Sequence, residues 1–292
     1  MSFTEAQRTD LINRIRRLSA PLAPRPTGIA PTGAWPRNLR AVIFDIYGTL
    51  FVSGAGDIGI TESGTEPLYR EAAVAAGLSL DDSAAAKLGA AFREEVKRQH
   101  AIRRAAGSTH PEVDVRQIWR AVLDAAISTA SASDETILRF AVEVECRLNP
   151  VWPMPGALAA IQRLRAQGLH LGIVSNAQCF TPLLFDALLE QSIENLGFTP
   201  RYCVWSWREG EAKPAPALLG KVLNALAEDH GITPGDVAFV GNDMLNDVLP
   251  AAQAGCATAL FAGDARSLRM REHDPRCANL HPTRILTHFD QA

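Results

Sequence analysis

The sequence is short of cysteine, and the cysteines it has form no recognisable framework. Five occur in 292 residues, an odd number, and no two of them form a CxxC pair. Small secreted domains and structural zinc sites depend on paired cysteines at short spacings. We therefore expect buried free thiols, with neither disulfides nor a cysteine metal site, at Cys146, Cys179, Cys203, Cys256 and Cys277.

The chain also lacks an excess of one charge and a long apolar run. Its net charge of −3 gives no electrostatic basis for binding nucleic acid. No stretch approaches the roughly 18 apolar residues that cross a membrane, and the N-terminus has no apolar signal core. With 47% hydrophobic and 21% charged residues, the composition is typical of globular proteins. We expect a soluble, cytoplasmic protein without a nucleic-acid or membrane partner.

The first 38 residues differ in composition from the rest. Thr4 to Leu18 places Leu11 and Ile15 on one helical face, and its arginines lie mostly elsewhere. Pro21 to Pro36 is rich in Pro, Gly and Ala, which predicts an extended linker. The apolar face of the helix would pack either on its own chain or on a second copy in a homodimer.

One apolar strand and then a helical block follow. Arg40 to Asp45 predicts a buried strand, and Phe51 to Ile60 a Gly-rich loop. No strand pattern interrupts the next stretch, where helical spacing recurs over Glu66–Ala76, Asp82–Ala106, Glu112–Ala130 and Asp134–Leu148. This pattern indicates a helical insert within one loop of a larger unit. An insertion of this kind costs little loop entropy.

After Pro150 strands and helices alternate. Helices are predicted at 156–167, 180–189, 215–230 and 247–254, and strands at 169–174, 202–205, 237–240 and 258–261. Alternation of this kind indicates βαβ units and a parallel sheet. We predict an α/β fold with a three-layer, Rossmann-like core at residues 39–60 and 151–292. An α-helical cap at 61–150 is inserted into it, and residues 1–38 form the N-terminal helix and linker.

The run Val42 to Leu50 is the most informative part of the chain. Its apolar residues end in Asp45, and Gly48 lets the backbone turn sharply as the strand ends. Open α/β sheets place their chemistry at the carboxyl ends of strands. Asp45 therefore suits a nucleophile or a metal ligand, although an Asp in this position alone can also be a turn or cap residue.

Like Asp45, three later polar segments lie where a predicted strand ends or a predicted helix begins. In chain order the four are Asp45-Ile46-Tyr47-Gly48-Thr49, Ser175-Asn176, Lys213-Pro214-Ala215-Pro216 and Gly241-Asn242-Asp243-Met244-Leu245-Asn246-Asp247. Their order, with the helical insert between the first and second, resembles the capped branch of the haloacid dehalogenase superfamily of hydrolases. The resemblance covers about residues 40–265.

Each segment taken singly has a simpler interpretation: a turn at Ser175, a solvated loop lysine at Lys213, and a helix N-cap at Asp247. Adjacent strand ends of one sheet would instead bring these groups into one pocket. There Asp45 would attack phosphorus, and hydroxyl, amide and ammonium groups would stabilise the phosphoryl oxygens. The predicted catalytic residues are Asp45, Thr49, Ser175, Asn176 and Lys213.

The resemblance also implies a metal ion. In this family the ion is Mg²⁺, held by the nucleophile, by the carbonyl two residues later and by the fourth segment. The ligands implied here are Asp45, Tyr47, Asn242, Asp243 and Asp247, which all offer the oxygen atoms that Mg²⁺ prefers. The ion would let an anionic nucleophile approach an anionic substrate.

Two positions depart from the phosphatase pattern in opposite directions. Family phosphatases carry a second Asp where this chain has Tyr47, and a phenol with an ordinary pKa of about 10 is a poor proton shuttle. Dehalogenating members carry Tyr there, but they place an Asn where this chain has Met244. The acids of the fourth segment make sense around a cation, and they are costly beside Asp45 without one.

The residues therefore predict a Mg²⁺-dependent phosphomonoester hydrolase of a small metabolite that works through an aspartyl-phosphate. The alternatives are a 2-haloacid dehalogenase that works through an aspartyl ester, and a non-catalytic binding module with a degenerate site. Candidate substrate contacts are Tyr47, Asp57 on the Gly-rich loop, and His110 and Glu112 at a turn of the cap. The segment after Asp264 is polar and weakly patterned, and it suggests no function.

Overall fold

The structure, a computed structural model, describes residues 3–55, 66–126 and 132–291. Its centre is a seven-stranded sheet in the order β1-β9-β8-β7-β2-β5-β6. All neighbouring strands are parallel except β1, which runs antiparallel to β9. The strands are β1 (Thr32–Gly33), β2 (Ala41–Phe44), β5 (His170–Ser175), β6 (Phe198–Trp205), β7 (Val237–Gly241), β8 (Ala257–Phe261) and β9 (Arg284–Leu286).

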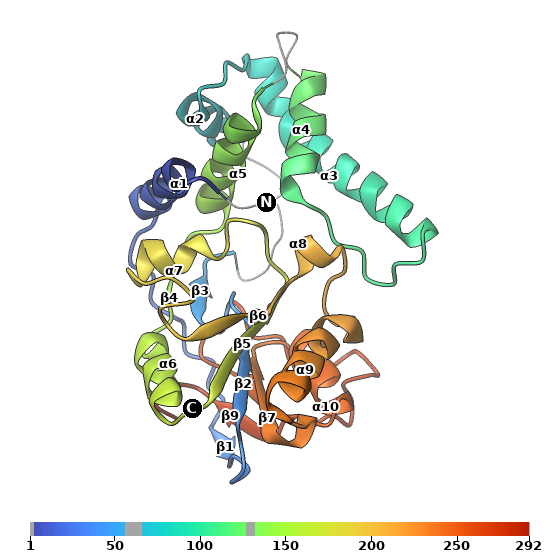
Figure 1. Cartoon of the computed structure of the whole chain (residues 1–292). Helices are drawn as coiled ribbons and strands as arrows, with labels where there is room; N and C mark the ends of the chain where they lie inside the picture. The colour runs from blue at the N-terminus through green and yellow to red at the C-terminus, as the bar shows by residue number, and fades with distance from the viewer. Residues whose placement is uncertain (1–2, 56–65, 127–131, 292) are drawn as a thin grey trace.

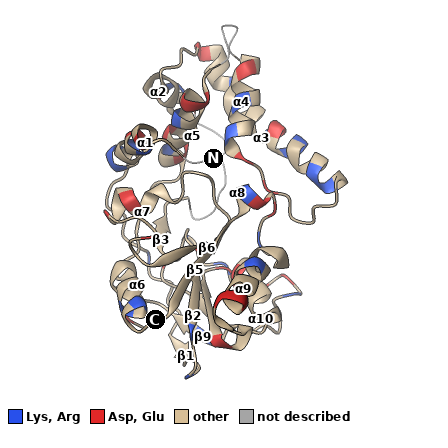
Figure 2. Ribbon diagram, in the orientation of Figure 1, with Lys and Arg blue, Asp and Glu red and all other residues tan. Residues whose placement is uncertain are grey.

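Helices cover both faces of this sheet (Figure 1). Alternate β2 side chains point to opposite faces, so that Val42 and Phe44 join one core and Ala41 and Ile43 the other. The first core includes α6 (Ala157–Ala166) and α7 (Leu183–Leu188), and the second includes α9 (Pro216–His230) and α10 (Leu249–Gln253). Because β2, β5 and β7 are buried on both faces, they contain no charged residue, and charges gather on the helices (Figure 2).

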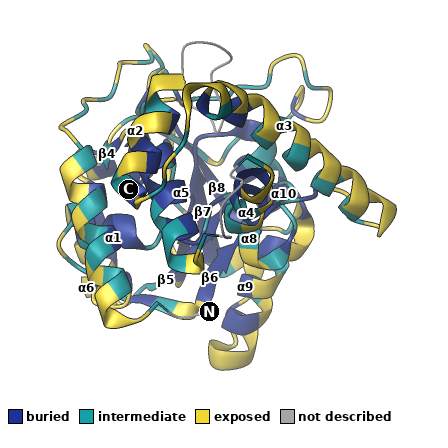
Figure 3. Ribbon diagram, turned by 90° about the horizontal axis from the view of Figure 1, so that it is seen from above, coloured by how far each residue is buried: buried dark blue, intermediate teal, exposed yellow. Residues whose placement is uncertain are grey.

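A helical insert stands above the carboxyl ends of these strands (Figure 1). It consists of α2 (Glu66–Ala76), α3 (Asp82–Ala105), α4 (Val115–Ala126) and α5 (Asp134–Leu148). The segments that lead into and out of it pair as a two-stranded antiparallel sheet of β3 (Phe51–Ser53) and β4 (Val151–Pro153). The insert has its own aromatic centre, where Trp119 contacts Phe92 and Phe140. Figure 3 shows α3 extending outward with a largely exposed surface.

The N-terminal helix α1 (Glu5–Leu18) packs on its own chain. Leu11 and Ile15 are buried against both α5 of the insert and α7 of the core. The segment that follows runs along the core, where Thr27 Oγ1 donates to the carbonyl of Ala262 at 2.9 Å. The first 38 residues therefore contact both the insert and the sheet-bearing part of the chain.

Several element boundaries differ from those that the sequence predicts. Phe51 to Ser53 forms strand β3, so the prediction of a loop from Phe51 was wrong there, because pairing with β4 supplies a partner that periodicity does not show. The helix predicted from Glu112 begins at Val115, since Pro111 to Asp114 is occupied by contacts with the core. The helix predicted from Asp247 is preceded by a π-helical turn that begins at Met244.

All five cysteines are buried and free, as expected. Among the described residues, none of the helices combines the length and apolar composition needed to cross a membrane.

Candidate active site

The first predicted segment forms a tight turn at the end of β2. Asp45 is 7% exposed, and its backbone amide donates to the carbonyl of Val240 on β7 at 3.0 Å. Gly48 adopts φ +79°, and a Cβ there would lie 2.4 Å from Cβ of Ser267. Only glycine meets both conditions without strain. The turn therefore presents the Asp45 carboxylate at the carboxyl edge of the sheet.

Lys213 joins two of the predicted carboxylates. Its Nζ lies 2.7 Å from Oδ1 of Asp45 and 2.5 Å from Oδ1 of Asp247. Burial alone would lower the pKa of Lys213, but the two carboxylates outweigh burial and raise it, so this side chain carries a permanent charge. The nucleophile candidate thus faces a fixed cation.

The second segment supplies a hydroxyl and a positioning amide. Ser175 ends β5 and is 1% exposed, and its Oγ has no hydrogen-bond partner within the described residues. Oδ1 of Asn176 accepts from the backbone N–H of Lys213 at 2.7 Å. The Asn176 side chain therefore holds the loop that carries Lys213, a role that sequence reasoning, which considered only its backbone amide, did not predict.

The fourth segment divides its polar groups between two tasks. Thr49 Oγ1 donates to Oδ1 of Asn242 at 3.1 Å, and Nδ2 of Asn242 donates to the carbonyl of Ser267 at 2.6 Å. Thr49 thus contacts the fourth segment through Asn242. Asp247 accepts from Lys213 and from the backbone N–H of Asp243, at 3.0 Å.

Asp243 faces an arginine that the sequence did not suggest. Arg271 approaches its carboxylate with two nitrogens, Nε at 3.0 Å and Nη2 at 2.6 Å. The same carboxylate also accepts from the backbone N–H of Leu245 at 2.9 Å and from Nδ2 of Asn246 at 2.9 Å. Both Asp243 oxygens are therefore already engaged.

Electrostatics inside this cluster oppose further negative charge. Burial raises the pKa of Asp247, and the carboxylates of Asp45 and Asp243 add to that rise while Lys213 opposes it. Around the cavity the described charged side chains balance, three Asp (Asp45, Asp243 and Asp247) against Lys213, Arg269 and Arg271. An entering phosphate dianion would leave two negative charges uncompensated.

Oxygen donors for a cation are present, but they do not form a complete cage. No three His, Cys, Asp or Glu side chains among the described residues are arranged to enclose a metal ion. Mg²⁺ commonly takes only one or two carboxylates and keeps several waters. Asp45 and the amide oxygen of Asn242 suit such an ion, whereas Asp243 would have to give up its pair with Arg271.

Tyr47 lies in the same cavity wall with its hydroxyl already paired. Tyr47 Oη and Thr181 Oγ1 are 3.0 Å apart. Burial, with the nearby carboxylate of Glu145, raises the pKa of Tyr47 well above its ordinary value. The side chain is a neutral phenol in this structure.

The cavity that these residues surround is small. It measures about 80 Å³, and its walls are Asp45, Tyr47, Ser53, Asn176, Lys213, Asn242, Asp243, Asn246, Asp247, Ser267 and Arg269. At ~30 Å³ per water, that volume holds roughly two or three waters, which is the scale of one phosphoryl group.

The predicted cap contacts lie elsewhere. Oε2 of Glu112 accepts from Ser206 Oγ at 2.8 Å, and the backbone N–H of His110 donates to Glu211 at 2.9 Å. Both residues thus join the insert to the core loop that leads to Lys213, and neither lines the cavity at Asp45. Asp57, the third candidate, lies outside the described residues.

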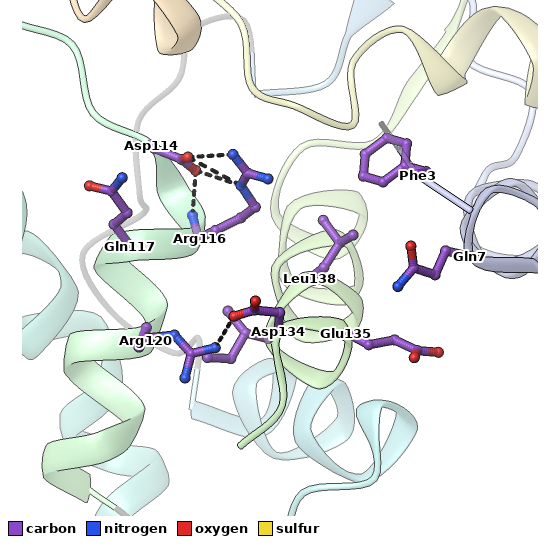
Figure 4. A pocket seen from close by; sticks show the side chains of 10 residues that line it. Phe3, Gln7, Asp114, Arg116, Gln117, Arg120, Asp134, Glu135 and Leu138 are labelled. Carbon is purple, nitrogen blue, oxygen red and sulfur yellow. Dashed lines mark hydrogen bonds and ion pairs between the residues drawn. The ribbon is translucent and has the colours of Figure 1, made fainter. Parts of the chain in front are cut away.

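A larger hollow of about 250 Å³ lies between the chain start, α4 and α5 (Figure 4). Its arginines are matched by acids: Arg116 contacts Asp114 at 2.6 Å, and Arg120 pairs with Asp134. Burial raises the pKa of nearby Cys179 to about 12, so that thiol is no nucleophile. The cavity at Asp45 is therefore the candidate site.

Sequence reasoning missed Ser267, Arg269 and Arg271, which reach the site from the segment after Asp264. Their only sequence signal is a pair of arginines near a serine in a segment without regular periodicity. It did find Asp45, Lys213 and Asp247, which the structure brings into direct contact.

The fold of this chain is similar to those of known proteins. A 2-haloacid dehalogenase from Pseudomonas syringae pv. Tomato DC3000 matches with a TM-score of 0.50 and 18% identity, over 87% of this chain and 96% of that one. A HAD phosphatase from Thermococcus onnurineus matches with a TM-score of 0.46 and 17% identity, over 87% and 95%. At these identities the likeness concerns the fold alone. No curated protein matches the sequence.

A family model described as haloacid dehalogenase-like hydrolase matches residues 39–255. This stretch includes all four polar segments and the helical insert between the first two, and the predicted α/β fold is confirmed. The chain therefore belongs to the haloacid dehalogenase-like hydrolases.

Proposed function

We propose that this hydrolase acts on a phosphate ester of a small molecule by forming an aspartyl-phosphate at Asp45. The observation that carries the proposal is the contact of Lys213 with both Asp45 and Asp247 in a cavity with three carboxylates. Three acids around so small a cavity suit a phosphoryl group that is accompanied by a cation.

The positions of the groups support the following reaction. An oxygen of Asp45 attacks phosphorus, an O–P bond forms, and the bond to the leaving oxygen breaks. Lys213 and the Ser175 hydroxyl stabilise the charge on the phosphoryl oxygens. Water then attacks the aspartyl-phosphate, which releases inorganic phosphate and restores the carboxylate.

Mg²⁺ is the proposed cofactor, held by Asp45 and by the amide oxygen of Asn242 and, as the family resemblance implies, the Tyr47 carbonyl. When bound, it supplies the positive charge that an incoming phosphate dianion requires here. Asp247 belongs to the same acidic group, but its carboxylate is directed at Lys213. Asp243 serves as the partner of Arg271.

The decisive experiment is hydrolysis of an activated aryl phosphate with and without Mg²⁺. Asp45→Asn should abolish turnover, whereas Asp290→Asn, an isosteric change at an exposed and distant site, should leave it intact. Unchanged turnover in Asp45→Asn would end the proposal. Failure of the parent protein across a broad phosphate and haloacid panel, without Mg²⁺ binding, would favour a non-catalytic binding module.

A second candidate is hydrolysis of a 2-haloacid, and Tyr47 favours it. The neutral Tyr47 phenol, paired with Thr181, occupies the place of the acid that would protonate an alkoxide leaving group. A halide leaves without a proton. This function predicts halide release that EDTA does not affect, and dependence on added Mg²⁺ would exclude it.

A further inference from the structure

Residues 264–271, which follow β8, fold across the fourth polar segment (residues 241–247) and form part of the site. The backbone N–H of Arg269 donates to the carbonyl of Asn242 at 2.9 Å, and that of Met244 donates to the carbonyl of Arg269 at 2.9 Å. With the bond from Asn242 Nδ2 to the carbonyl of Ser267, these contacts fix the segment 264–271 along the motif. The segment lies outside residues 39–255, which match the family model.

Ser267 carries the observation that points to a ligand. The residue is 1% exposed and lines the cavity at Asp45, yet its Oγ has no partner among the described residues. A buried hydroxyl without a partner costs free energy, so most are bonded. Ser53 Oγ, which donates to Asn149, and Ser206 Oγ, which donates to Glu112, follow that rule. Ser108 Oγ also lacks a partner among the described residues, but it does not line this cavity.

Ser175 provides an internal comparison. It is the residue whose hydroxyl we expect to donate to the phosphoryl group, and it too is buried and without a partner. Ser267 shares this state beside the turn that follows Asp45, since a Cβ added at Gly48 would lie 2.4 Å from Cβ of Ser267. Arg269, two residues further on, adds a positive charge to the cavity wall, with Nη1 fixed 2.7 Å from the carbonyl of Arg266.

We propose that Ser267 is an additional oxyanion-binding residue whose hydroxyl donates to an oxygen of the phosphoryl group, with Arg269 beside it attracting the anion. The inference rests on the proposed function for its substrate class, a tetrahedral oxyanion. The Ser175 and Ser267 hydroxyls would then supply donors from both the second polar segment and residues 264–271.

The test compares Ser267→Ala with the parent in orthovanadate and inorganic phosphate binding by calorimetry, in Mg²⁺ buffer, and in thermal unfolding. We expect the Kd of both anions to rise about tenfold, the effect of one lost hydrogen bond to a charged group. The melting temperature should stay the same or rise, because the variant loses no bond within the protein. Thr258→Val, which removes a buried hydroxyl bonded to Thr283, should lower the melting temperature and leave anion binding unchanged.

A lower melting temperature with unchanged anion affinity would show a structural serine and overturn the inference, as would a parent protein that binds neither anion. The two proposals fail separately. Loss of anion affinity in Ser267→Ala, in a protein that hydrolyses no phosphate ester, would uphold the binding residue and reject the proposed reaction. If the parent protein hydrolyses phosphate esters and Ser267→Ala leaves anion binding unchanged, the proposed reaction stands and Ser267 is rejected as a binding residue.

Discussion

Arg14 on α1 donates to Glu143 on α5 at 2.7 Å, across 129 positions of sequence. The Glu143 side chain is fully buried, and Arg17 and Arg147 approach it at 2.7 Å and 2.5 Å. On the other side of α1, Arg8 pairs with Asp186 of α7 at 2.6 Å. The N-terminal helix thus bridges the helical insert and the core, and its charged residues bind both.

Glu143 should therefore be the most sensitive charged residue of this junction. Glu143→Ala leaves the partly buried guanidinium groups of Arg14 and Arg147 close together without a counter-charge, so we expect a loss of about 3–5 kcal/mol in unfolding free energy. Urea denaturation measures it. Arg17→Ala, in which the removed side chain is 60% exposed, should cost under about 1 kcal/mol. Equal costs for both would contradict the argument.

Local patterns in the sequence were enough for the elements that carry Asp45, Ser175 and Lys213. Each lies next to a strand or helix with clear periodicity. Parallel pairing of β2 with β5 brings Asp45 and Ser175 to the same edge of the sheet, where Lys213 contacts Asp45. The docking of α1 was left open between two partners, since an amphipathic face does not name what covers it.

The rest of the site depends on contacts between distant segments that have no periodicity. Arg271 reaches Asp243, and Ser267 reaches Asn242, because the chain folds back after β8. The sequence shows polar residues there, but it does not show which backbone carbonyl each will face. For the same reason, the sequence could predict Asn242 only as a metal ligand.

The structure explains why an Asn is favourable at position 242. Its Nδ2 donates to the carbonyl of Ser267 at 2.6 Å, and an Asp would bring a carboxylate oxygen against that carbonyl. In EDTA, Asn242→Asp should therefore lose about 1–3 kcal/mol of unfolding free energy. Added Mg²⁺ should restore part of it, because a carboxylate is the stronger ligand. Melting curves in EDTA and in MgCl₂ test this. If the melting temperature of Asn242→Asp is the same in both, residue 242 is not a metal ligand.

A separate prediction concerns the leaving group. No carboxyl stands two residues after Asp45, so a phosphate ester must release its leaving oxygen without a proton from that position. We expect kcat/KM to fall steeply across aryl phosphates as the pKa of the leaving phenol rises. Tyr47→Asp should flatten this dependence, whereas Tyr47→Phe, which only removes the contact with Thr181, should keep it. A flat dependence in the parent would place a general acid elsewhere.

The junction between insert and core should also respond to pH through Glu112. Burial raises the pKa of Glu112 above its ordinary 4.5, although the Val113 amide, Ser206 and Arg103 of α3 oppose that rise. The folded state then holds the proton more tightly than the unfolded state does. The stability from this group is full below pH 4.5 and is lost as pH rises through the folded pKa.

Glu112→Gln keeps the shape of the side chain and removes its titration. Unfolding free energies between pH 4 and 7, measured by urea denaturation in steps of roughly half a pH unit, should therefore decline with pH in the parent relative to the variant. Parallel profiles for the two proteins would show that Glu112 is ionised with the same pKa in both states, and that burial between insert and core does not control it.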